Sequence, residues 1–223
     1  MKSRIIKEFG VIFDMDGVLV DSTKYIWNSF NKLLEPYGIH FSDKEIKKYL
    51  GLSLRDQVAL WKKEYGIDLD YMKFSKEAGE MELNLMQDKR PNKSLVNLLN
   101  ELKKKKVKIG IGTSSLRWRA DRIVDLLKIK EYFPVIITSE EVINHKPNPD
   151  LFLKAAEKIN ISPENCVVIE DAASGVEAAK RGNMKAIGFL TDYNSKRELE
   201  KADLIINDFS ELSYKKIENL FLK

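Results

Sequence analysis

The stretch Phe13-Asp14-Met15-Asp16-Gly17-Val18 decides the fold, because it closes the first apolar run of the chain with two aspartates and a glycine. The apolar residues from Phe9 to Phe13 predict a buried strand that ends where the aspartates begin. Residues i and i+2 of an extended strand share a face, so an extension of this strand would carry both carboxylates toward one point. Paired acids at a strand end, with no histidine partner, indicate a site for a divalent cation and an anionic substrate.

The composition is that of an ordinary globular protein. The 223 residues suffice for one large domain or for one domain with an insertion. Hydrophobic residues make up 43% and charged residues 32%, and 38 Lys and Arg against 34 Asp and Glu leave a net charge of +4. This small excess indicates no nucleic-acid partner. We interpret the run Lys103-Lys104-Lys105-Lys106 as the solvated C-terminal end of a helix, where cations are favourable.

The cysteine content and the hydropathy of the chain indicate in which cellular compartment the protein is expected. The single cysteine, Cys166, excludes an internal disulfide and is expected to be a buried, inert thiol. No stretch approaches the length of about 18 apolar residues that a membrane span needs, so we expect no membrane partner. The N-terminal residues Met1-Lys2-Ser3-Arg4 lead into Ile5 and Ile6, an apolar run too short and too quickly interrupted by charge to belong to a signal peptide. We therefore expect a cytoplasmic protein, either a monomer or a weak homodimer.

Short apolar runs along the chain predict six strands. Between most of them, apolar residues follow a helical spacing, as Leu95, Leu98, Leu99 and Leu102 do. Alternation of strands and helices over this length predicts an α/β fold, a Rossmann-like parallel sheet with helices on both faces. The predicted strands cover residues 9–13, 107–112, 134–137, 166–169, 185–190 and 203–206.

One gap interrupts this alternation. After Asp21 no strand is expected until Val107, and the intervening residues show four helical patterns instead. Such a block is long enough for a small domain. We therefore expect an all-α cap domain at residues 22–90, inserted between the two parts of an α/β catalytic core at residues 1–21 and 91–223.

Polar residues follow four of the predicted strands at their carboxyl ends, where ligands bind in open parallel sheets. A carboxylate can attack phosphorus, while a hydroxyl and a lysine can donate to the phosphoryl oxygens. Oxygen ligands without Cys or His select a hard cation such as Mg²⁺. Each group alone could be a turn or a helix cap, but four in this order are hard to obtain by chance. The four groups are Asp14 with Asp16, Thr113-Ser114-Ser115, Lys146-Pro147-Asn148-Pro149-Asp150, and Glu170-Asp171.

These four segments resemble the four motifs of the haloacid dehalogenase superfamily. The first match extends from Phe13 to Ser22, and the fourth from Ile169 to Ala179. The whole resemblance spans residues 9 to about 190. The helical insertion after the first motif is similar to the cap of the branch that contains β-phosphoglucomutase and phosphoglycolate phosphatase.

The resemblance implies a role for each matched residue. Asp14 would be the nucleophile, and Asp16 would protonate the leaving oxygen and later activate water. Thr113 and Lys146 would complete the catalytic set by gripping the phosphoryl group. The ligands of Mg²⁺ would be Asp14, the main-chain carbonyl of Asp16, Asp171 and, directly or through a bridging water, Glu170.

Substrate contacts are expected from both sides of the site. Ser114 and Ser115 would contribute from the second motif, and Gly51 and Arg55 from the segment after the second helix of the insertion. The cap is expected to close over the site and to exclude water. Further candidates are Tyr25, Ile26, Asn28, Leu52, Ser53 and, at the entrance, Trp118.

Three functions fit these residues. The first is a Mg²⁺-dependent phosphatase that hydrolyses a small phosphorylated metabolite, of the phosphoglycolate or sugar phosphate type, through an aspartyl phosphate. The second is a phosphoryl transferase similar to β-phosphoglucomutase, but Ile26 and Leu54 stand where that enzyme has a cap histidine and an arginine. The third is a non-enzymatic phospho-accepting or binding protein. The large helical insertion and the complete catalytic set favour an enzyme over this third function.

Overall fold

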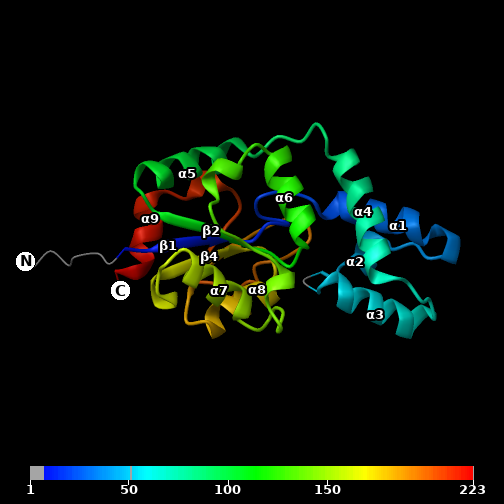
Figure 1. The fold of residues 1–223 in the computed structure, drawn as a ribbon. Coiled ribbons are helices and arrows are strands. Elements are labelled where there is room, and N and C mark those ends of the chain that lie inside the picture. The colour runs from blue at the N-terminus through cyan, green and yellow to red at the C-terminus, as the bar shows by residue number, and fades with distance from the viewer. Residues whose placement is uncertain (1–7, 51, 223) are drawn as a thin grey trace, which may run out of the picture.

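A parallel sheet forms the centre of the computed structural model, which describes residues 8–50 and 52–222. Its order is β3-β2-β1-β4-β5-β6, and every neighbouring pair of strands is parallel (Figure 1). All six predicted strands are present, and their bounds differ from the predicted ones by at most two residues. The strands are β1 (Gly10–Phe13), β2 (Lys108–Gly112), β3 (Ile136–Ile137), β4 (Cys166–Glu170), β5 (Lys185–Phe189) and β6 (Leu204–Ile206).

Helices cover both faces of the sheet, as predicted. Successive residues of a strand point to opposite faces, so Val11 and Phe13 of β1 join one apolar cluster and Ile12 joins another. The first cluster includes side chains of α5 (Lys93–Lys104), α6 (Arg117–Leu126) and α9 (Tyr214–Glu218). The second includes side chains of α7 (Asp150–Lys158) and α8 (Ala173–Arg181). β1 and, up to Ile169, β4 are apolar because both faces of these central strands are buried.

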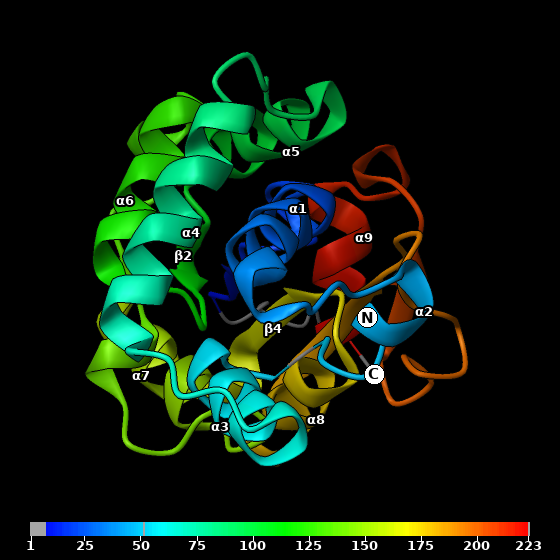
Figure 2. The same ribbon diagram turned by 90° about the vertical axis from the view of Figure 1, so that its right-hand side faces the viewer.

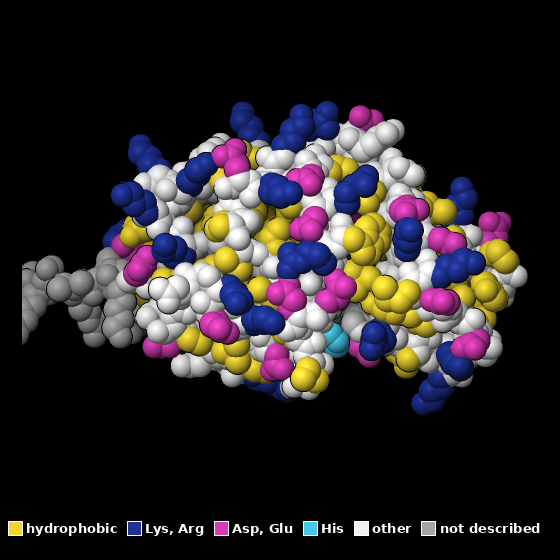
Figure 3. All heavy atoms as spheres, in the orientation of Figure 1, with side chains coloured by type: hydrophobic (Ala, Val, Ile, Leu, Met, Phe, Trp, Pro, Cys, Tyr) yellow, Lys and Arg dark blue, Asp and Glu magenta, His cyan; other side chains and the backbone are white. Residues whose placement is uncertain are grey.

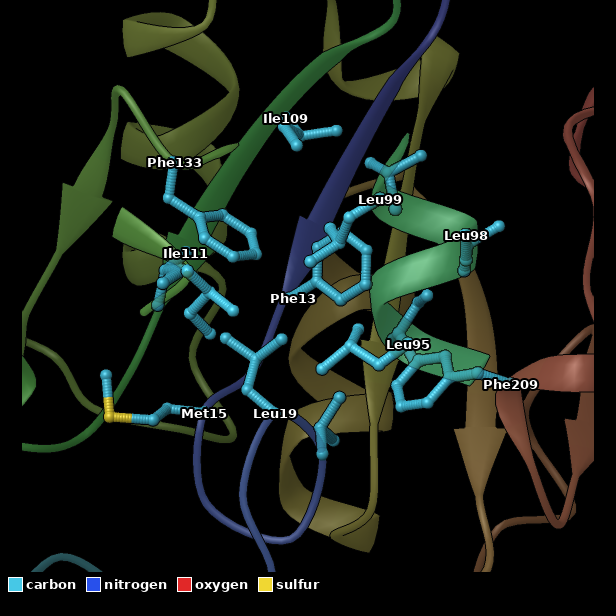
Figure 4. Packing of buried hydrophobic residues seen from close by; sticks show 14 of the residues in the cluster. Phe13, Met15, Leu19, Leu95, Leu98, Leu99, Ile109, Ile111, Phe133 and Phe209 are labelled. Carbon is cyan, nitrogen blue, oxygen red and sulfur yellow. The ribbon is translucent and has the colours of Figure 1, made fainter. Parts of the chain in front are cut away.

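Phe13 anchors the end of β1 in the first of these clusters. Figure 4 shows the Phe13 ring beside Leu95 and Leu99 of α5, with Phe209 beyond Leu95. The ring centre lies 5.5 Å from that of Phe133 in an edge-on arrangement. Phe13 is fully buried, so the backbone that follows it leaves the core at a fixed point.

Four helices lie together beyond the carboxyl ends of the strands (Figure 1). We call them the cap helices: α1 (Thr23–Leu34), α2 (Asp43–Ile46), α3 (Leu54–Tyr65) and α4 (Tyr71–Leu85). Their number agrees with the sequence pattern, although α2 is a single turn and leaves Leu50 outside it. A division into domains at residues 21/22 and 90/91 remains a prediction.

The cap helices have an apolar cluster of their own, centred on Trp61. This indole is fully buried, and its ring centre lies 5.7 Å from that of Phe30 and 5.5 Å from that of Phe41. Trp27 meets Trp61 edge-on at 6.3 Å. These tryptophans therefore supply the packing of the cap helices.

The remaining elements are short 3₁₀ turns, and the surface carries mixed charge. Acidic and basic side chains are interspersed over the face seen in Figure 3. Among the described helices, none has the length and apolar character that crossing a membrane requires. Cys166 is buried as expected, and burial raises the pKa of its thiol to about 12. The 3₁₀ turns are Glu35–Tyr37, Lys130–Tyr132, Ser139–Glu141, Pro163–Asn165, Phe209–Glu211 and Asn219–Phe221.

Candidate active site

The strand register brings the first and fourth motif segments together. Phe13 is paired with Ile169 of β4, and the Asp14 N–H donates to the Ile169 carbonyl at 2.9 Å. Asp14 therefore lies beside Glu170. On the other side Phe13 is paired with Ile111 of β2, whose strand leads into the second motif. Motif residues that are distant in sequence thus meet at one edge of the sheet.

A cavity of about 470 Å³ lies between this edge and the cap helices. Its lining includes every predicted catalytic and metal-binding residue, and the predicted substrate contacts Ser114 and Ser115. The cap side is mostly apolar. The lining residues on the core side include Asp14, Asp16, Thr113, Ser114, Ser115, Lys146, Glu170 and Asp171, and those on the cap side include Ile26, Leu50, Leu52, Ser53, Leu54 and Gln57.

Lys146 joins the two strand ends electrostatically. Its ammonium donates to Asp14 Oδ1 at 2.5 Å and to Glu170 Oε1 at 2.6 Å. The three side chains are only 6%, 8% and 1% exposed, respectively. Burial by itself lowers the pKa of Lys146, but the two carboxylates outweigh it and raise that pKa above the ordinary value. Lys146 therefore presents a permanent positive charge to the cavity.

Asp14, Glu170 and Asp171 form a cluster suited to a hard cation. Each offers a carboxylate oxygen, and these oxygens all lie within 4.8 Å of one another. Burial raises the pKa of Asp14 to about 7. Burial, followed by the charges of Glu170 and Asp14, raises the pKa of Asp171 well above its ordinary value. A divalent cation would stabilise the ionised forms, so the donor set fits Mg²⁺.

Two glycines make room for these acids. At Gly17, where φ is +79°, an added Cβ would lie 2.0 Å from Oδ2 of Asp171. At Gly175 an added Cβ would lie 1.8 Å from Oε1 of Glu170. The glycines of the first and fourth motifs therefore serve close packing around the carboxylates as well as the turn.

Asp16 reaches the cavity by a turn, so the predicted extension of β1 is wrong. β1 ends before the first aspartate, and a turn at Met15 follows. The Asp16 carboxylate accepts hydrogen bonds from Ser22 Oγ at 2.5 Å, from Ser115 Oγ at 2.9 Å and from the Arg119 guanidinium at 2.7 and 2.8 Å. Burial by itself raises the pKa of Asp16, but Arg119 and these hydrogen bonds outweigh it and hold the pKa below its ordinary value.

The second motif is held by its backbone. The Thr113 N–H donates to the Ile137 carbonyl at 2.9 Å, which continues the pairing of β2 with β3. Thr113 Oγ1 accepts from the Ser115 N–H at 3.1 Å. This local turn brings Thr113, Ser114 and Ser115 to the cavity wall together.

Four predicted candidates do not line the cavity. Tyr25 packs against the core cluster, and Asn28 is exposed. The exposed Arg55 sits in a neighbouring hollow of about 310 Å³, where its guanidinium lies 5.2 Å from the ring centre of Tyr71. Trp118 packs against the core cluster and against Gly79 of α4. Gly51 lies outside the described residues, so the structure places no contact there.

Four charged residues of the cavity lining are absent from the sequence analysis: Lys47, Glu82 of α4, Arg119 of α6 and Glu198. Glu82 and Arg119 are the two that act on Asp16. The guanidinium pairs with Asp16 and with Glu82 at the same time. Glu82 falls on the buried stripe of its helix, four residues after Ala78. A charged residue on an apolar helical stripe is the signal that could have indicated a buried ion pair.

Comparison with known proteins assigns the family. The model of the haloacid dehalogenase-like hydrolases matches residues 11–189. The chain belongs to this family. The match covers all four motif segments of this haloacid dehalogenase-like hydrolase, and it confirms the resemblance inferred from them.

Similar proteins in this family include phosphatases and mutases. The chain is 29% identical over 197 residues to the phosphorylated carbohydrates phosphatase of Thermotoga maritima, with 87% of this chain and 91% of the relative covered. It is 28% identical over 211 residues to the β-phosphoglucomutase of Bacillus subtilis, with 91% of each covered. The structure of β-phosphoglucomutase from Clostridium difficile matches with a TM-score of 0.83 at 25% identity, over 96% of this chain and 99% of that one.

Proposed function

We propose that this hydrolase is a Mg²⁺-dependent phosphatase that acts on a small phosphorylated carbohydrate through an aspartyl phosphate on Asp14. The observation that carries the proposal is the placement of Asp14 at the cavity wall. There it contacts the Lys146 ammonium at 2.5 Å and lies within 4.8 Å of two further carboxylates. A carboxylate with an adjacent fixed cation and a cation-binding cluster is suited to attack a phosphate ester.

The proposed reaction consists of two displacements at phosphorus. First, an Asp14 oxygen bonds to phosphorus while the bond from phosphorus to the ester oxygen breaks. Asp16, which would first have to take up from solvent the proton that Arg119 disfavours, gives that proton to the ester oxygen. Second, water attacks phosphorus and gives its proton to Asp16, while the bond to Asp14 breaks and phosphate leaves. Thr113 and Lys146 would donate to the phosphoryl oxygens in both displacements.

Asp14, Glu170 and Asp171 would hold the Mg²⁺ ion, together with the main-chain carbonyl of Asp16. When bound, the ion supplies the positive charge that lets a carboxylate and a phosphate dianion approach each other. The raised pKa values of Asp14 and Asp171 support this assignment, because both acids lack sufficient neutralising charge from Lys146 alone.

The cap side of the cavity supports a sugar phosphate over phosphoglycolate. The Gln57 amide donates to the carbonyls of Tyr49 and Leu52 at 3.2 Å each, which fixes its orientation. Its Oε1 is buried and has no hydrogen-bond partner among the described residues. A substrate hydroxyl could donate to this oxygen, whereas a substrate carboxylate could not.

The mutase remains the alternative, and a product assay separates it from the phosphatase. A mutase would isomerise a sugar phosphate and release little free phosphate. Ile26 and Leu54 line the cavity where the sequence comparison expected a mutase histidine and arginine, and Arg55 lies outside it. Ile26 and Leu54 support the phosphatase, because a bisphosphate intermediate needs a second anion site. Lys47, which also lines the cavity, is the cap-side cation that such a site would have to use.

The decisive experiment measures free phosphate from a panel of sugar phosphates and phosphoglycolate, with Mg²⁺ and with a chelator. The Asp14→Asn variant should release no phosphate, since it lacks the nucleophile. Asp21→Asn is the matched control, because Asp21 is exposed and its carboxylate lies 3.9 Å from Lys89 at the surface. Phosphate release that persists in Asp14→Asn would refute the assignment, and an isomerised sugar phosphate as the main product would replace it with the mutase.

A further inference from the structure

Arg119 bridges the catalytic core and the cap helices. On one side, its Nε and Nη2 donate to the two oxygens of Glu82 at 2.7 and 2.6 Å. On the other side, its Nη1 and Nη2 donate to the two oxygens of Asp16 at 2.8 and 2.7 Å. Nη1 also contacts Ser115 Oγ. A planar guanidinium can hold two carboxylates at once in this way, and an ammonium cannot.

The bridge is enclosed by the protein. The side chains of Arg119 and Glu82 are 11% and 2% exposed, and burial opposes the charged forms of both. A buried ion pair contributes little net stability, because desolvation offsets the attraction between the charges. This bridge is therefore better explained by the placement of Asp16 than by stability.

The Asp16 carboxylate is fully held by its neighbours. Oδ1 accepts from Ser22 Oγ at 2.5 Å and from Arg119 Nη2. Oδ2 accepts from Ser115 Oγ at 2.9 Å and from Arg119 Nη1. Each oxygen accepts two hydrogen bonds, and Arg119 donates one of them in each case. The position of the guanidinium therefore fixes the rotamer of Asp16.

The cap helix α4 fixes the other end of the bridge. One turn before Glu82, Gly79 lies against the indole of Trp118, and an added Cβ would come within 2.4 Å of that ring. Beyond it, Leu83 and Met86 are buried in the core cluster. Figure 2 shows α4 and α6 side by side along this contact. The Glu82 carboxylate is therefore held at a defined place beside Arg119.

We propose that Arg119 is a positioning residue, which fixes the Asp16 side chain at the cavity wall where the leaving oxygen of the substrate would lie, while Glu82 of the cap fixes the guanidinium. This inference rests on the proposed phosphatase function and assigns a part of its machinery to the contact between α4 and α6. Correct placement of a proton-transfer group matters most when the leaving group is strongly basic.

The test compares two substrates in the full-length enzyme with Mg²⁺. Glycerol 1-phosphate needs its leaving alkoxide protonated, whereas the nitrophenolate of p-nitrophenyl phosphate leaves readily without a proton. For Arg119→Met we expect kcat/KM, which reports the transfer to Asp14 and the departure of the leaving group, to fall about 100-fold with glycerol 1-phosphate and less than about tenfold with p-nitrophenyl phosphate. Arg122→Met, an exposed arginine of the same helix, should match the unaltered enzyme with both substrates.

A double-variant comparison tests whether Arg119 acts through Asp16. Asp16→Asn should also slow the reaction of glycerol 1-phosphate more than that of p-nitrophenyl phosphate. Adding Arg119→Met to Asp16→Asn should lower kcat/KM only slightly further. Equal slowing of both substrates by Arg119→Met, or full additivity with Asp16→Asn, would overturn the proposal.

Two variants that alter the bridge less than Arg119→Met guard against misfolding. Arg119→Lys retains the charge but cannot hold both carboxylates, and Glu82→Gln weakens the cap side of the bridge. Both variants should slow the reaction of glycerol 1-phosphate more than that of p-nitrophenyl phosphate, but by less than Arg119→Met does. Full activity of both variants would also overturn the positioning role. Failure of the phosphatase function would look different, because the unaltered enzyme would then release no phosphate from either substrate.

Discussion

Asp14 combines deep burial with two acidic neighbours and a lysine contact. The lysine stabilises its ionised form, yet burial still raises its pKa to about 7. A carboxyl with this pKa is only partly ionised at neutral pH unless further positive charge is bound nearby. Under the proposed function, a cation bound by Asp14, Glu170 and Asp171 would therefore also ionise the nucleophile.

Mg²⁺ affinity should depend on pH because of Asp14. Below pH 7 its carboxyl carries a proton that the ion must displace, so affinity should be about tenfold weaker at pH 6 than at pH 8. Titration calorimetry in two buffers of different ionisation enthalpy measures both the affinity and the protons released. Asp21→Asn should leave this dependence unchanged, and an affinity that is the same at pH 6 and pH 8 would contradict the assignment of Asp14 as a ligand.

Gln57 should contribute to substrate affinity through its free Oε1. In Gln57→Met we expect KM for fructose 1-phosphate to rise about five- to tenfold, the effect of one hydrogen bond of about 1 kcal/mol. KM for p-nitrophenyl phosphate, which lacks hydroxyls, should be unchanged. Gln87→Met, at an exposed position, is the matched control. An equal rise for both substrates would indicate a general disturbance of the cavity instead.

At the scale of elements, α4 belongs to two apolar clusters. Phe74 and Ala78 near its start pack with the cap helices, and Leu83 and Met86 near its end pack with the core. The helix carries Glu82 at the transition between them. Because α4 packs against both clusters, the position of the cap helices relative to the edge of the sheet is fixed through this one helix.

Gly79→Ala should destabilise the protein although alanine is the better helix former. Helix propensity alone favours alanine by about 1 kcal/mol. The added Cβ would overlap the Trp118 indole, and overpacking of this kind costs about 1–3 kcal/mol. Urea denaturation should show the loss, and Glu80→Ala on the exposed side of α4 should change stability by less than about 0.5 kcal/mol. A stabilised Gly79→Ala variant would show that α4 and α6 do not approach each other so closely.

At the scale of the whole molecule, the cap helices and the sheet hold separate hydrophobic clusters. The cluster around Trp61 lies apart from the two that cover the sheet. The cavity lies between the sheet and the cap helices; its core side is mostly polar, and its cap side is mostly apolar. Under the proposed function, the chemistry would come from the core side and most contacts to the rest of the substrate from the cap side.

Trp61→Ala should destabilise the cap helices more than the sheet. Truncation of a fully buried tryptophan costs about 3–5 kcal/mol. Hydrogen exchange should show faster opening in α1 and α3 with the central strands still protected, and sugar phosphate turnover should fall. Met72→Ala, at a 59% exposed position of α4, is the control. Equal loss of protection in β1 and β4 would show that the two bodies unfold as one.

Local pattern determined much of this protein. Continuous apolar runs identified every strand, because strands buried on both faces leave a signal that needs no tertiary context. The same runs located Asp14, Thr113 and Asp171 at strand ends and Lys146 in the loop after the third strand, and parallel pairing brings these strand ends to one cavity. The family and the class of chemistry followed from these residues alone.

Tertiary structure decided the contacts between segments. Arg119 lies 37 residues from Glu82 and 103 from Asp16 in sequence, so no local pattern could pair them. The position of Arg55 outside the cavity likewise depends on how α3 meets Tyr71. The residues at a strand end are placed by the strand itself, which the local sequence identifies. The partner of a charged helix side chain depends instead on which two helix faces pack together, and this packing is set only when the whole chain has folded.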